Sequence, residues 1–589
     1  MMSKPMSPAT LLLRYWRSAE KWRAAGLLAL IITLEMGTVY ASVEISNWQR
    51  HFFDALADFH YAAISTLMFT LALLMALSVL SKAFSVWFTQ LLTLHWRTWL
   101  VEIFLQRWLQ HRAYQRLESQ ALTDNPDQRI AEDLSLLAEK SLSLGLGLLS
   151  NLANAVSFAV ILWGLSGALS LSLWGHDIRV PGYMLWVAIA YALLGSWIME
   201  KVGGPLVALS YQRQRYEADF RYQLVRVREH AEQIAFYRGE NEEARRLHAA
   251  FAAIRRNWRS LMTYSKRVAF TETLYIDASS FVPYLFVIPR YFAKEITIGG
   301  VMQMSVGFSR LRTALSWFLF NYQDLALLRA ALQRLCDFDA ALCHSPHSDI
   351  QTTPADDGIL RIRDLHLHLP DGSTLCTLPD TDVLPGERWM IVGGSGNGKS
   401  TLLRALAGLW PYGSGSIALP GGTRLFLPQR SYLPVGTLRE ALCYPTGVFD
   451  DAHCREVLRQ VRLEHLLDAL DQVHPWDKYL SGGEQQRLAF ASILLQRPDY
   501  VFLDEATSAL DRDNETHLYQ LLHDTLPATT VISVTHHAHL AHWHHHQLQV
   551  IAQPRNSAGP TSPSTVENPT PLPSAQACLT ATTHTIGEQ

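Results

Sequence analysis

Long apolar runs fill much of the first half of the chain and predict six membrane-spanning helices. Most of these runs are close to, or exceed, the roughly 20 residues with which a helix crosses the hydrocarbon core of a bilayer. We expect Pro283 and Pro289 to kink the fifth helix, because proline removes a backbone hydrogen bond. The predicted spans are Ala24–Ser46, Ala62–Thr93, Ser143–Leu171, Met184–Val202, Thr273–Phe292 and Gly299–Phe320.

The two long polar connections between spans also have a helical pattern. Leu94–Lys140 and Pro205–Arg267 show helical periodicity and few breakers. Because the spans run into them without linkers, we expect the membrane helices to continue into the cytosol; a separate helical domain is the alternative. The first 23 residues are amphipathic and basic, which predicts a segment at the inner membrane surface.

The distribution of basic residues orients these helices. Pro205–Arg267 is rich in Lys and Arg, whereas the short loop predicted over Asn47–Tyr61 carries only Arg50, with Trp48 at the outer interface. Basic segments near membrane spans remain in the cytosol. The N-terminus, both long connections and the C-terminal half are therefore predicted to be cytosolic.

Composition agrees with a membrane protein of more than one domain. The chain has 589 residues, too many for a single core, with 49% hydrophobic and 17% charged residues. A net charge of −3 gives no electrostatic footprint for nucleic acid. Six scattered cysteines without a C-x-x-C pair indicate reduced thiols rather than a disulfide framework.

A glycine-rich loop between an apolar strand and a helix predicts a phosphate-binding site. The run Gly393-Gly394-Ser395-Gly396-Asn397-Gly398-Lys399-Ser400 follows Trp389–Val392 and is followed by Thr401 at the helix start. This is the P-loop pattern, in which backbone N–H groups surround phosphates. Lys399 is predicted to reach the β- and γ-phosphates of ATP, and Ser400 to hold Mg²⁺. A glycine loop without a ligand is the alternative.

Two further segments extend this site. Ser481-Gly482-Gly483-Glu484 opens a second helix and so offers a second anion-binding N-terminus, which suits a nucleotide held by another copy of the chain. The apolar strand Tyr500–Leu503 ends in Asp504, expected to bind Mg²⁺ through water, and Glu505, expected to polarise the attacking water.

The order of these motifs resembles the nucleotide-binding domain of ABC transporters. The resemblance implies that Gln429 is the Q-loop and a further Mg²⁺ ligand, Ser481–Glu484 the signature, Asp511 the D-loop and His536 the catalytic switch histidine. It implies an exporter-type, six-helix transmembrane domain joined to an α/β P-loop ATPase domain, working as a homodimer. The predicted parts are an amphipathic segment (1–23), a transmembrane domain (24–337), a linker (338–358), an ATPase domain (359–552) and a disordered tail (553–589).

Several shorter stretches resemble one branch of this family, the SbmA/BacA-like permeases fused to an ATPase, which are related to the subfamily D acyl-CoA transporters. The resemblance implies uptake of hydrophilic compounds (peptides, bleomycin-like glycopeptides or cobalamin) across the bacterial inner membrane. Acyl-CoA or lipid transport, export, and an ATPase that gates a membrane partner are the alternatives. The stretches are Asn47–Leu56, Asn125–Asp133, Ile234–Glu240, Gly408–Pro411 and Leu427–Pro434.

Charged residues within the spans are candidates for a substrate cavity. Polar groups in a membrane usually face a partner or a cavity, which favours Glu35, Asp277 and Arg310. Snorkelling to the interface is the alternative, above all for Lys82 and Arg312.

The ATPase region has two unusual features: a leucine at the usual place of an adenine-stacking aromatic residue, and a run of histidines. Leu369 stands where many ABC ATPases carry an aromatic residue that stacks on adenine. A histidine-rich run from His536 to His546 could suggest metal binding, but we expect only His536 to be functional.

Overall fold

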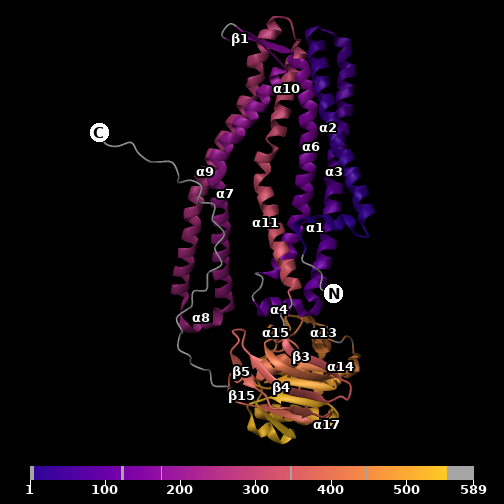
Figure 1. Ribbon diagram of the computed structural model, residues 1–589, viewed down its shortest axis with the longest axis vertical. Helices are drawn as coiled ribbons and strands as arrows, with labels where there is room; N and C mark the ends of the chain where they lie inside the picture. Colours follow the sequence, from indigo (N-terminus) through magenta and orange to yellow (C-terminus); the bar gives the residue numbers. More distant parts are fainter. Residues whose placement is uncertain are drawn as a thin grey trace, which may run out of the picture. The chain divides into compact units, whose positions relative to one another are not determined.

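The computed structural model describes residues 6–120, 125–173, 176–344, 348–445, 447 and 449–552 (Figure 1). These fall into two compact units, Met1–His344 and Ser345–Gln589. The first is helical apart from one β-hairpin, and the second is an α/β unit. The predicted disordered tail lies outside the described residues.

Long helices make up the first unit. The N-terminal part contains α1 (Pro8–Leu13), the 3₁₀ turn η1 (Tyr15–Arg17), α2 (Lys21–Ala57), α3 (Tyr61–Leu109), η2 (Gln110–Arg112), α4 (Ala113–Ser119), α5 (Pro126–Gln128), the π-turn η3 (Arg129–Asp133) and α6 (Leu134–Ser166). The hairpin β1 (Ala168–Leu173) and β2 (His176–Pro181) precedes α7 (Tyr183–Glu229), α8 (Ala231–Tyr237), α9 (Glu240–Phe292), α10 (Ile298–Leu315) and α11 (Trp317–Cys343).

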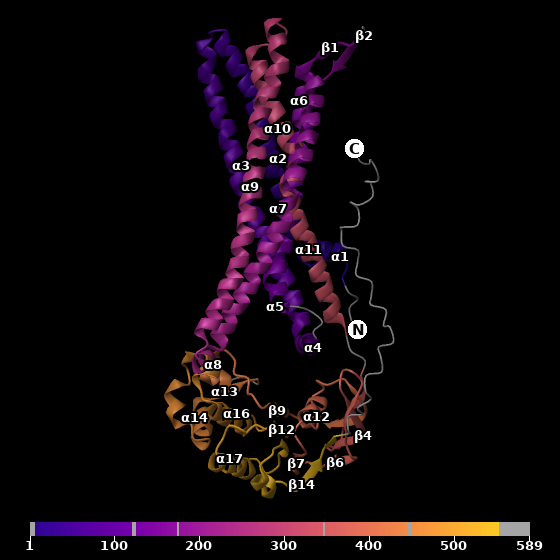
Figure 2. The same ribbon diagram turned by 90° about the vertical axis from the view of Figure 1, so that its left-hand side faces the viewer.

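Helix α10 is the best-buried part of the bundle. It packs against α2, α6, α7 and α9, while α2 pairs with α3 and α7 pairs with α9 (Figure 2). Met304, Phe308 and Leu311 of α10 meet Phe158 and Leu162 of α6 in one apolar cluster. Helices α6, α7 and α9 therefore share an apolar core with α10.

Four helical segments are long and apolar enough to cross a membrane: Lys21–Ala57, Tyr61–Ser119, Pro126–Ser166 and Tyr183–Glu229. Within the described residues, the predicted fifth and sixth spans do not meet that apolar criterion. Helix α10 buries Gln303 and Arg312, which a helix surrounded by protein rather than lipid can carry. Helix α9 continues as one helix through Pro283 and Pro289.

The loop predicted over Asn47–Tyr61 is much shorter in the structure. Helix α2 continues through residues 47–57, and the turn to α3 is confined to Asp58–His60. Residues 47–57 contain neither Gly nor Pro, so nothing local ends the helix. The indole of Trp48 donates to the Leu67 carbonyl at 2.6 Å, and the Asp54 carboxylate accepts from the Gly299 N–H at 2.9 Å.

The third predicted span also ends early. Helix α6 stops at Ser166, since Gly167 adopts φ +61° and the chain enters the β1–β2 hairpin. The second, fourth and fifth predicted spans are extended, because α3, α7 and α9 continue well beyond them into the polar connections. The sixth predicted span is interrupted at Ser316, between α10 and α11.

The N-terminal segment packs on the protein instead of forming one interfacial helix. Its helix breaks between α1 and α2, and Leu11 and Tyr15 are buried. Tyr15 stacks on Trp96 of α3 at 5.7 Å, and the Met6 N–H donates to Asp339 of α11. Aromatic packing thus attaches this segment to α3, and a hydrogen bond attaches it to α11.

The predicted linker 338–358 is largely regular structure. Helix α11 runs to Cys343 because Leu335, Phe338 and Leu342 form a buried stripe. The strand β3 (Asp349–Ala355) pairs in parallel with β8 (Gly413–Pro420), so the second unit includes residues before 359.

Two main sheets organise the second unit. The five-stranded parallel sheet has the order β14-β7-β13-β12-β9, with β14 (His546–Gln549), β7 (Arg388–Val392), β13 (Thr530–Val534), β12 (Tyr500–Asp504) and β9 (Arg424–Leu427). The second sheet has the order β15-β5-β4-β8-β3, with β15 (Ile551–Ala552), β5 (Thr374–Thr377) and β4 (Leu360–His368), and with β6 (Thr381–Val383) paired to β4.

Helices and a short ribbon complete the unit. They are α12 (Lys399–Leu406), α13 (Leu438–Cys443), α14 (Asp451–Gln460), η4 (Glu464–Ala469), α15 (Trp476–Tyr479), α16 (Gly482–Gln496), α17 (Arg512–Thr525), η5 (Ala538–Trp543) and the pair β10 (Gly436–Thr437) and β11 (Val473–His474). The central strands are buried on both faces, as a parallel sheet covered by helices requires.

Candidate functional site

The parallel sheet brings the predicted catalytic residues to one edge. In its register Asp504 lies opposite Val534, which lies opposite Ile391. The carboxyl ends of parallel strands meet at the same edge, where ligands of open α/β sheets bind. The segments that follow β7, β9, β12 and β13 therefore meet there, and they carry the P-loop, Gln429, Glu505 and His536.

The P-loop backbone is shaped by its glycines. Gly398, at the start of α12, has φ +94°, and a Cβ there would lie 2.9 Å from Leu375 Cδ2 and 3.1 Å from Cys376 Sγ. A Cβ on Gly393 would lie 2.7 Å from the Val550 carbonyl oxygen. Strand β5 and the segment after β14 thus confine the loop from outside, a contact that the sequence motif did not reveal.

The predicted phosphate-binding lysine is held inside this loop. The ammonium of Lys399, which is only 6% exposed, donates to the carbonyls of Gly393 and Gly394 at 2.9 and 3.0 Å. Asn397 donates to the Val550 carbonyl at 3.3 Å, while Ser395 is exposed. Thr401 lies half-buried in the first turn of α12.

The two oxygen donors predicted for Mg²⁺ face each other. Ser400 Oγ donates to Asp504 Oδ1 at 2.8 Å. Burial raises the pKa of Asp504, the Ser400 hydrogen bond opposes that rise, and the charge of Glu505 adds to it. Hydroxyl and carboxylate oxygens suit a hard cation, so this donor set fits Mg²⁺.

Glu505 is the centre of the edge. Its Oε2 accepts from the Gln429 amide at 3.0 Å, and its Oε1 lies 3.1 Å from His536 Nε2. Its backbone has φ +48°, and its N–H donates to the Val534 carbonyl. The carboxylate remains partly exposed to solvent, as a residue that must reach a water molecule requires.

The Ser481–Glu484 turn forms a capping box at the start of α16. The Ser481 hydroxyl and N–H donate to Glu484 Oε2 at 2.7 and 2.9 Å. Burial raises the pKa of Glu484, but the hydrogen bonds from Ser481 and His465 outweigh it and hold the pKa below its ordinary value. Gly482 and Gly483 complete the first turn. Within the described part of the chain, no hydrogen bond or ion pair links this turn to the P-loop.

This turn is instead attached to the segment that carries Asp511. The Gln486 amide donates to Ser508 Oγ at 3.3 Å and accepts from the Ala509 N–H at 2.9 Å. Asp511 caps α17 by accepting from the Asn514 N–H at 2.8 Å. A predicted signature and a predicted D-loop therefore form one connected block.

The histidine-rich run is held in part by a carboxylate that sequence reasoning missed. His537 Nδ1 and His539 Nε2 lie 2.8 and 2.9 Å from Glu515 Oε2. Glu515 was hidden because it looks like one of many polar residues on the surface of a helix. Among the described residues, no group of three or more His, Cys, Asp or Glu side chains is arranged to hold a metal.

A polar pocket among the membrane helices contains one of the predicted cavity residues. Glu35 of α2 accepts from Lys82 Nζ at 3.0 Å and from Ser85 Oγ at 2.6 Å, both on α3. The pocket has a volume of about 330 Å³. Its lining is completed by Val86, Thr89, Gln90, Ser143, Leu146, Gly147, Ser150 and Asn151.

The other charged candidates lie elsewhere. Asp277 on α9 and Arg310 on α10 are exposed and do not line this pocket. Arg312, for which snorkelling was the alternative, is buried with its guanidinium 5.2 Å from the Tyr275 ring centre. The expectation that Glu35, Asp277 and Arg310 share one cavity is therefore not met by this pocket.

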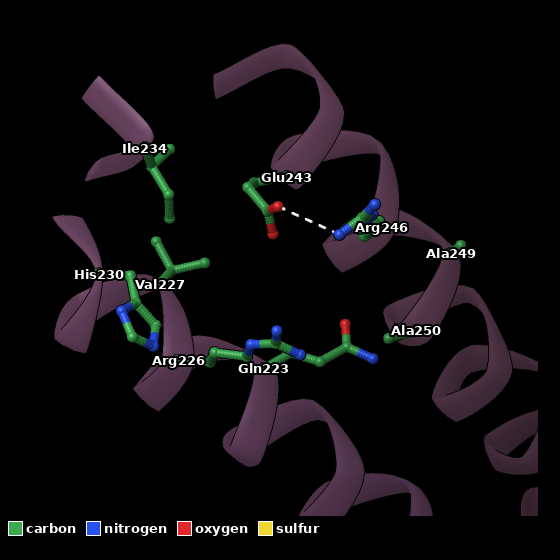
Figure 3. A pocket seen from close by; sticks show the side chains of 9 residues that line it. All are labelled: Gln223, Arg226, Val227, His230, Ile234, Glu243, Arg246, Ala249 and Ala250. Atoms are coloured by element: carbon green, nitrogen blue, oxygen red, sulfur yellow. Dashed lines mark hydrogen bonds and ion pairs between the residues drawn. The ribbon is translucent and has the colours of Figure 1, made fainter. Parts of the chain in front are cut away.

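A second polar pocket, of about 510 Å³, lies between α7, α8 and α9 (Figure 3). Arg226 lines it from α7, His230 from the junction of α7 and α8, and Ile234 from α8. Glu243 and Arg246 line it from α9, with 3.3 Å between their side chains. Sequence analysis did not single out these residues, since a polar helix surface gives no motif.

Comparisons with known proteins agree with the two units. Residues 12–292 match the family "ABC transporter transmembrane region 2", and residues 379–508 match "ABC transporter". The chain is 33% identical to the inner membrane ABC transporter ATP-binding protein YddA of Escherichia coli, over 89% of this chain and 94% of that protein. It is 27% identical to the human lysosomal cobalamin transporter ABCD4, over 90% of this chain and 91% of that protein.

A solved structure supports the fold. A bacterial Atm1-family ABC exporter with ATP bound superimposes with a TM-score of 0.70, over 89% of this chain and 92% of that chain, at 17% identity. The predicted exporter-type fold, with a helical transmembrane domain and an α/β ATPase domain, is confirmed. The chain belongs to the ABC transporter family as a half-transporter, related to YddA and to subfamily D, with an ATP-hydrolysing domain and a transmembrane region in one polypeptide.

Proposed function

We propose that this half-transporter works as a homodimer in the bacterial inner membrane and imports a hydrophilic cargo with the energy of ATP hydrolysis. One observation supports it above all: the P-loop, Asp504, Glu505 and His536 gather at one sheet edge in a chain that also carries membrane-length apolar helices. In this arrangement the ATPase domain and the N-terminus are cytosolic.

ATP hydrolysis follows from the roles of the gathered side chains. Lys399 would exchange its two loop carbonyls for phosphate oxygens of ATP. Ser400, Asp504 and Gln429 would hold Mg²⁺, which neutralises phosphate charge. Glu505 would accept a proton from the attacking water while the water oxygen forms a bond to the γ-phosphorus. The bond between the γ-phosphorus and the oxygen that leaves with ADP breaks in the same step. His536 would keep that carboxylate in place.

The second anion-binding turn supports a shared site between two copies. Helix α16 has 15 residues and Ser481 as its N-cap, so its first turn offers N–H groups without partners inside the helix and a favourable dipole. This turn is bound to its own D-loop segment by Gln486. We propose that it contacts the γ-phosphate of a nucleotide in the P-loop of the partner copy, with Asp511 nearby.

The polar pocket of α2, α3 and α6 supports a hydrophilic cargo. Glu35, Lys82 and Ser85 place an ion pair and a hydroxyl among helices of membrane length. Such groups are costly next to lipid tails and are retained where a wet path or a partner needs them. The relationship to a cobalamin transporter agrees with such a cargo. Asp277 and Arg310 do not line this pocket, and they would contribute to a cargo path only where the homodimer brings them next to it.

Uptake by cells tests this function. Cells lacking the protein should lose sensitivity to bleomycin and proline-rich peptides or lose cobalamin uptake, and wild type but not Glu505→Gln should restore it. Unchanged sensitivity and uptake, with ATPase activity stimulated only by acyl-CoA, would replace the hydrophilic cargo with an acyl one. ATPase activity without ATP-dependent flux in vesicles would indicate an ATPase that gates a membrane partner.

A further inference from the structure

A buried carboxylate joins the two chain segments that carry the proposed catalytic carboxylate and switch histidine. Glu515, in the first turn of α17, is 1% exposed. Its Oε1 accepts from Thr507 Oγ at 2.5 Å, and its carboxylate lies 2.8 Å from His537 Nδ1 and 2.9 Å from His539 Nε2. One side chain thus contacts three residues from two segments.

The partners of Glu515 are sequence neighbours of the catalytic groups. Thr507 follows Glu505 by two positions, and His537 is next to His536. The His537 N–H also donates to Thr535 Oγ at 3.1 Å, which closes a turn around His536. Glu515 therefore connects the chain segment that carries Glu505 to the segment that carries His536.

The carboxylate at the centre of this cluster is buried, while the His537 side chain is half-exposed. An ionised carboxylate removed from water must find hydrogen bonds from its surroundings, and losing one donor leaves an unpaired charge. The Thr507 hydroxyl and His537 Nδ1 supply hydrogen bonds, and His539 Nε2 approaches to 2.9 Å. Tyr519, one turn further along α17, is also buried. The cluster therefore has few alternative arrangements.

We propose that Glu515 is a positioning residue that holds Glu505 and His536 at their 3.1 Å separation for ATP hydrolysis. This rests on the proposed roles of Glu505 and His536. It assigns the histidine-rich run a purpose beyond His536: His537 and His539 are contacts for a buried carboxylate. Glu515 itself touches neither the P-loop nor Glu505 among the described contacts, so its removal changes turnover and leaves nucleotide binding intact.

The test separates kcat from KM in the purified full-length protein. Glu515→Gln, which keeps the shape but removes the charge, should lower kcat roughly tenfold and leave the KM for ATP within about twofold. The matched control is Glu387→Gln. Glu387 lies 3.3 Å from His546 and accepts from Trp389 Nε1, but it precedes β7 at the opposite end of the strands. The control should keep the wild-type kcat.

Thr507 provides a second, independent pair of variants. Thr507→Val removes the hydroxyl at nearly constant shape and should lower kcat. Thr507→Ser keeps the hydroxyl donor and should have most of the wild-type kcat. These variants decide the question if Glu515→Gln does not fold. Wild-type kcat in folded Glu515→Gln or Thr507→Val would overturn the proposal, as would a parallel loss of ATP binding. Active Glu505→Gln protein would instead overturn the proposed function.

Discussion

At the scale of single residues, Glu505 combines features that a general base needs. Gln429 and His536 hold its two carboxylate oxygens, while the side chain remains partly exposed. The neighbouring Asp504 is turned to Ser400 and differs in environment, since burial raises its pKa. Two adjacent carboxylates thus receive different tasks, one at the proposed metal and one at the proposed water.

The first prediction concerns Glu505→Gln. It should lower the ATPase kcat by roughly 10²-fold or more, because an amide cannot accept the proton. ATP binding, measured by calorimetry, should remain, since Lys399 and the loop backbone hold the phosphates. Glu456→Gln is the control: Glu456 pairs with Arg459 on the surface of α14 and should be neutral. Near-normal turnover in Glu505→Gln would assign the catalytic carboxylate elsewhere.

The second prediction concerns Gly398→Ala. A Cβ would be strained at φ +94° and would crowd Leu375 and Cys376. Strain of about 1–3 kcal/mol at a loop that must close on phosphates predicts ATP binding weaker by about fivefold to 150-fold. Calorimetric titration with ATP measures this. Gly421→Ala, where a Cβ meets no atom within 4 Å, should bind ATP like the wild type.

At the scale of elements, α10 shows how a polar helix is placed inside a membrane bundle. Its start is fixed on α2, because the Gly299 N–H donates to Asp54 and Gln303 donates to Asn47 at 2.8 Å. The continuation of α2 beyond the predicted first loop supplies both partners. Extending α2 therefore has a structural role, since it anchors the start of α10, where the sequence predicts the sixth span.

The third prediction tests this anchor with Gly299→Ala. A Cβ at Gly299 would lie 2.1 Å from the Arg50 carbonyl oxygen, so α10 would have to move away from α2. Overpacking of this kind costs about 1–3 kcal/mol. The melting temperature in detergent should fall by several degrees. Gly26→Ala, on α2 and with no atom within 4 Å of the added Cβ, should not lower it. Equal melting temperatures for both variants would contradict the close contact.

At the scale of the whole molecule, one chain provides one P-loop and one Ser-Gly-Gly turn. If both act on one nucleotide, a second copy must supply the partner motif, and two-fold pairing then creates two equivalent sites. All the motifs are intact, which favours two active sites over one active and one degenerate site.

The fourth prediction distinguishes shared sites from separate ones. Dimers with Lys399→Ala on one chain and Ser481→Ala on the other should keep one intact site and part of the ATPase activity. Dimers with both substitutions on one chain should have both sites damaged and should lose more of the ATPase activity. Higher activity in these dimers than in the first kind would mean that each chain hydrolyses ATP with its own Ser-Gly-Gly turn. Tagged co-purification isolates the mixed dimers for measurement.

The sequence by itself determined the local chemistry and the general architecture. The P-loop and the Asp504–Glu505 pair could be predicted because glycine spacing, a buried strand and adjacent carboxylates are local features. Six apolar runs were predicted as spans from hydropathy, and four of them lie in described helices that are long and apolar enough to cross a membrane. The roles of Gln429 and His536 came from the resemblance to the nucleotide-binding domain of ABC transporters.

Tertiary structure decided what depends on contacts between distant residues. The end of α2, the membership of β3 in the ATPase unit and the pairing of Glu35 with Lys82 all require a partner far away in the chain. The same holds for Glu515, which local sequence marks only as a polar helical residue. Its burial against Thr507 and His537 arises because the sheet brings the ends of β12 and β13 together.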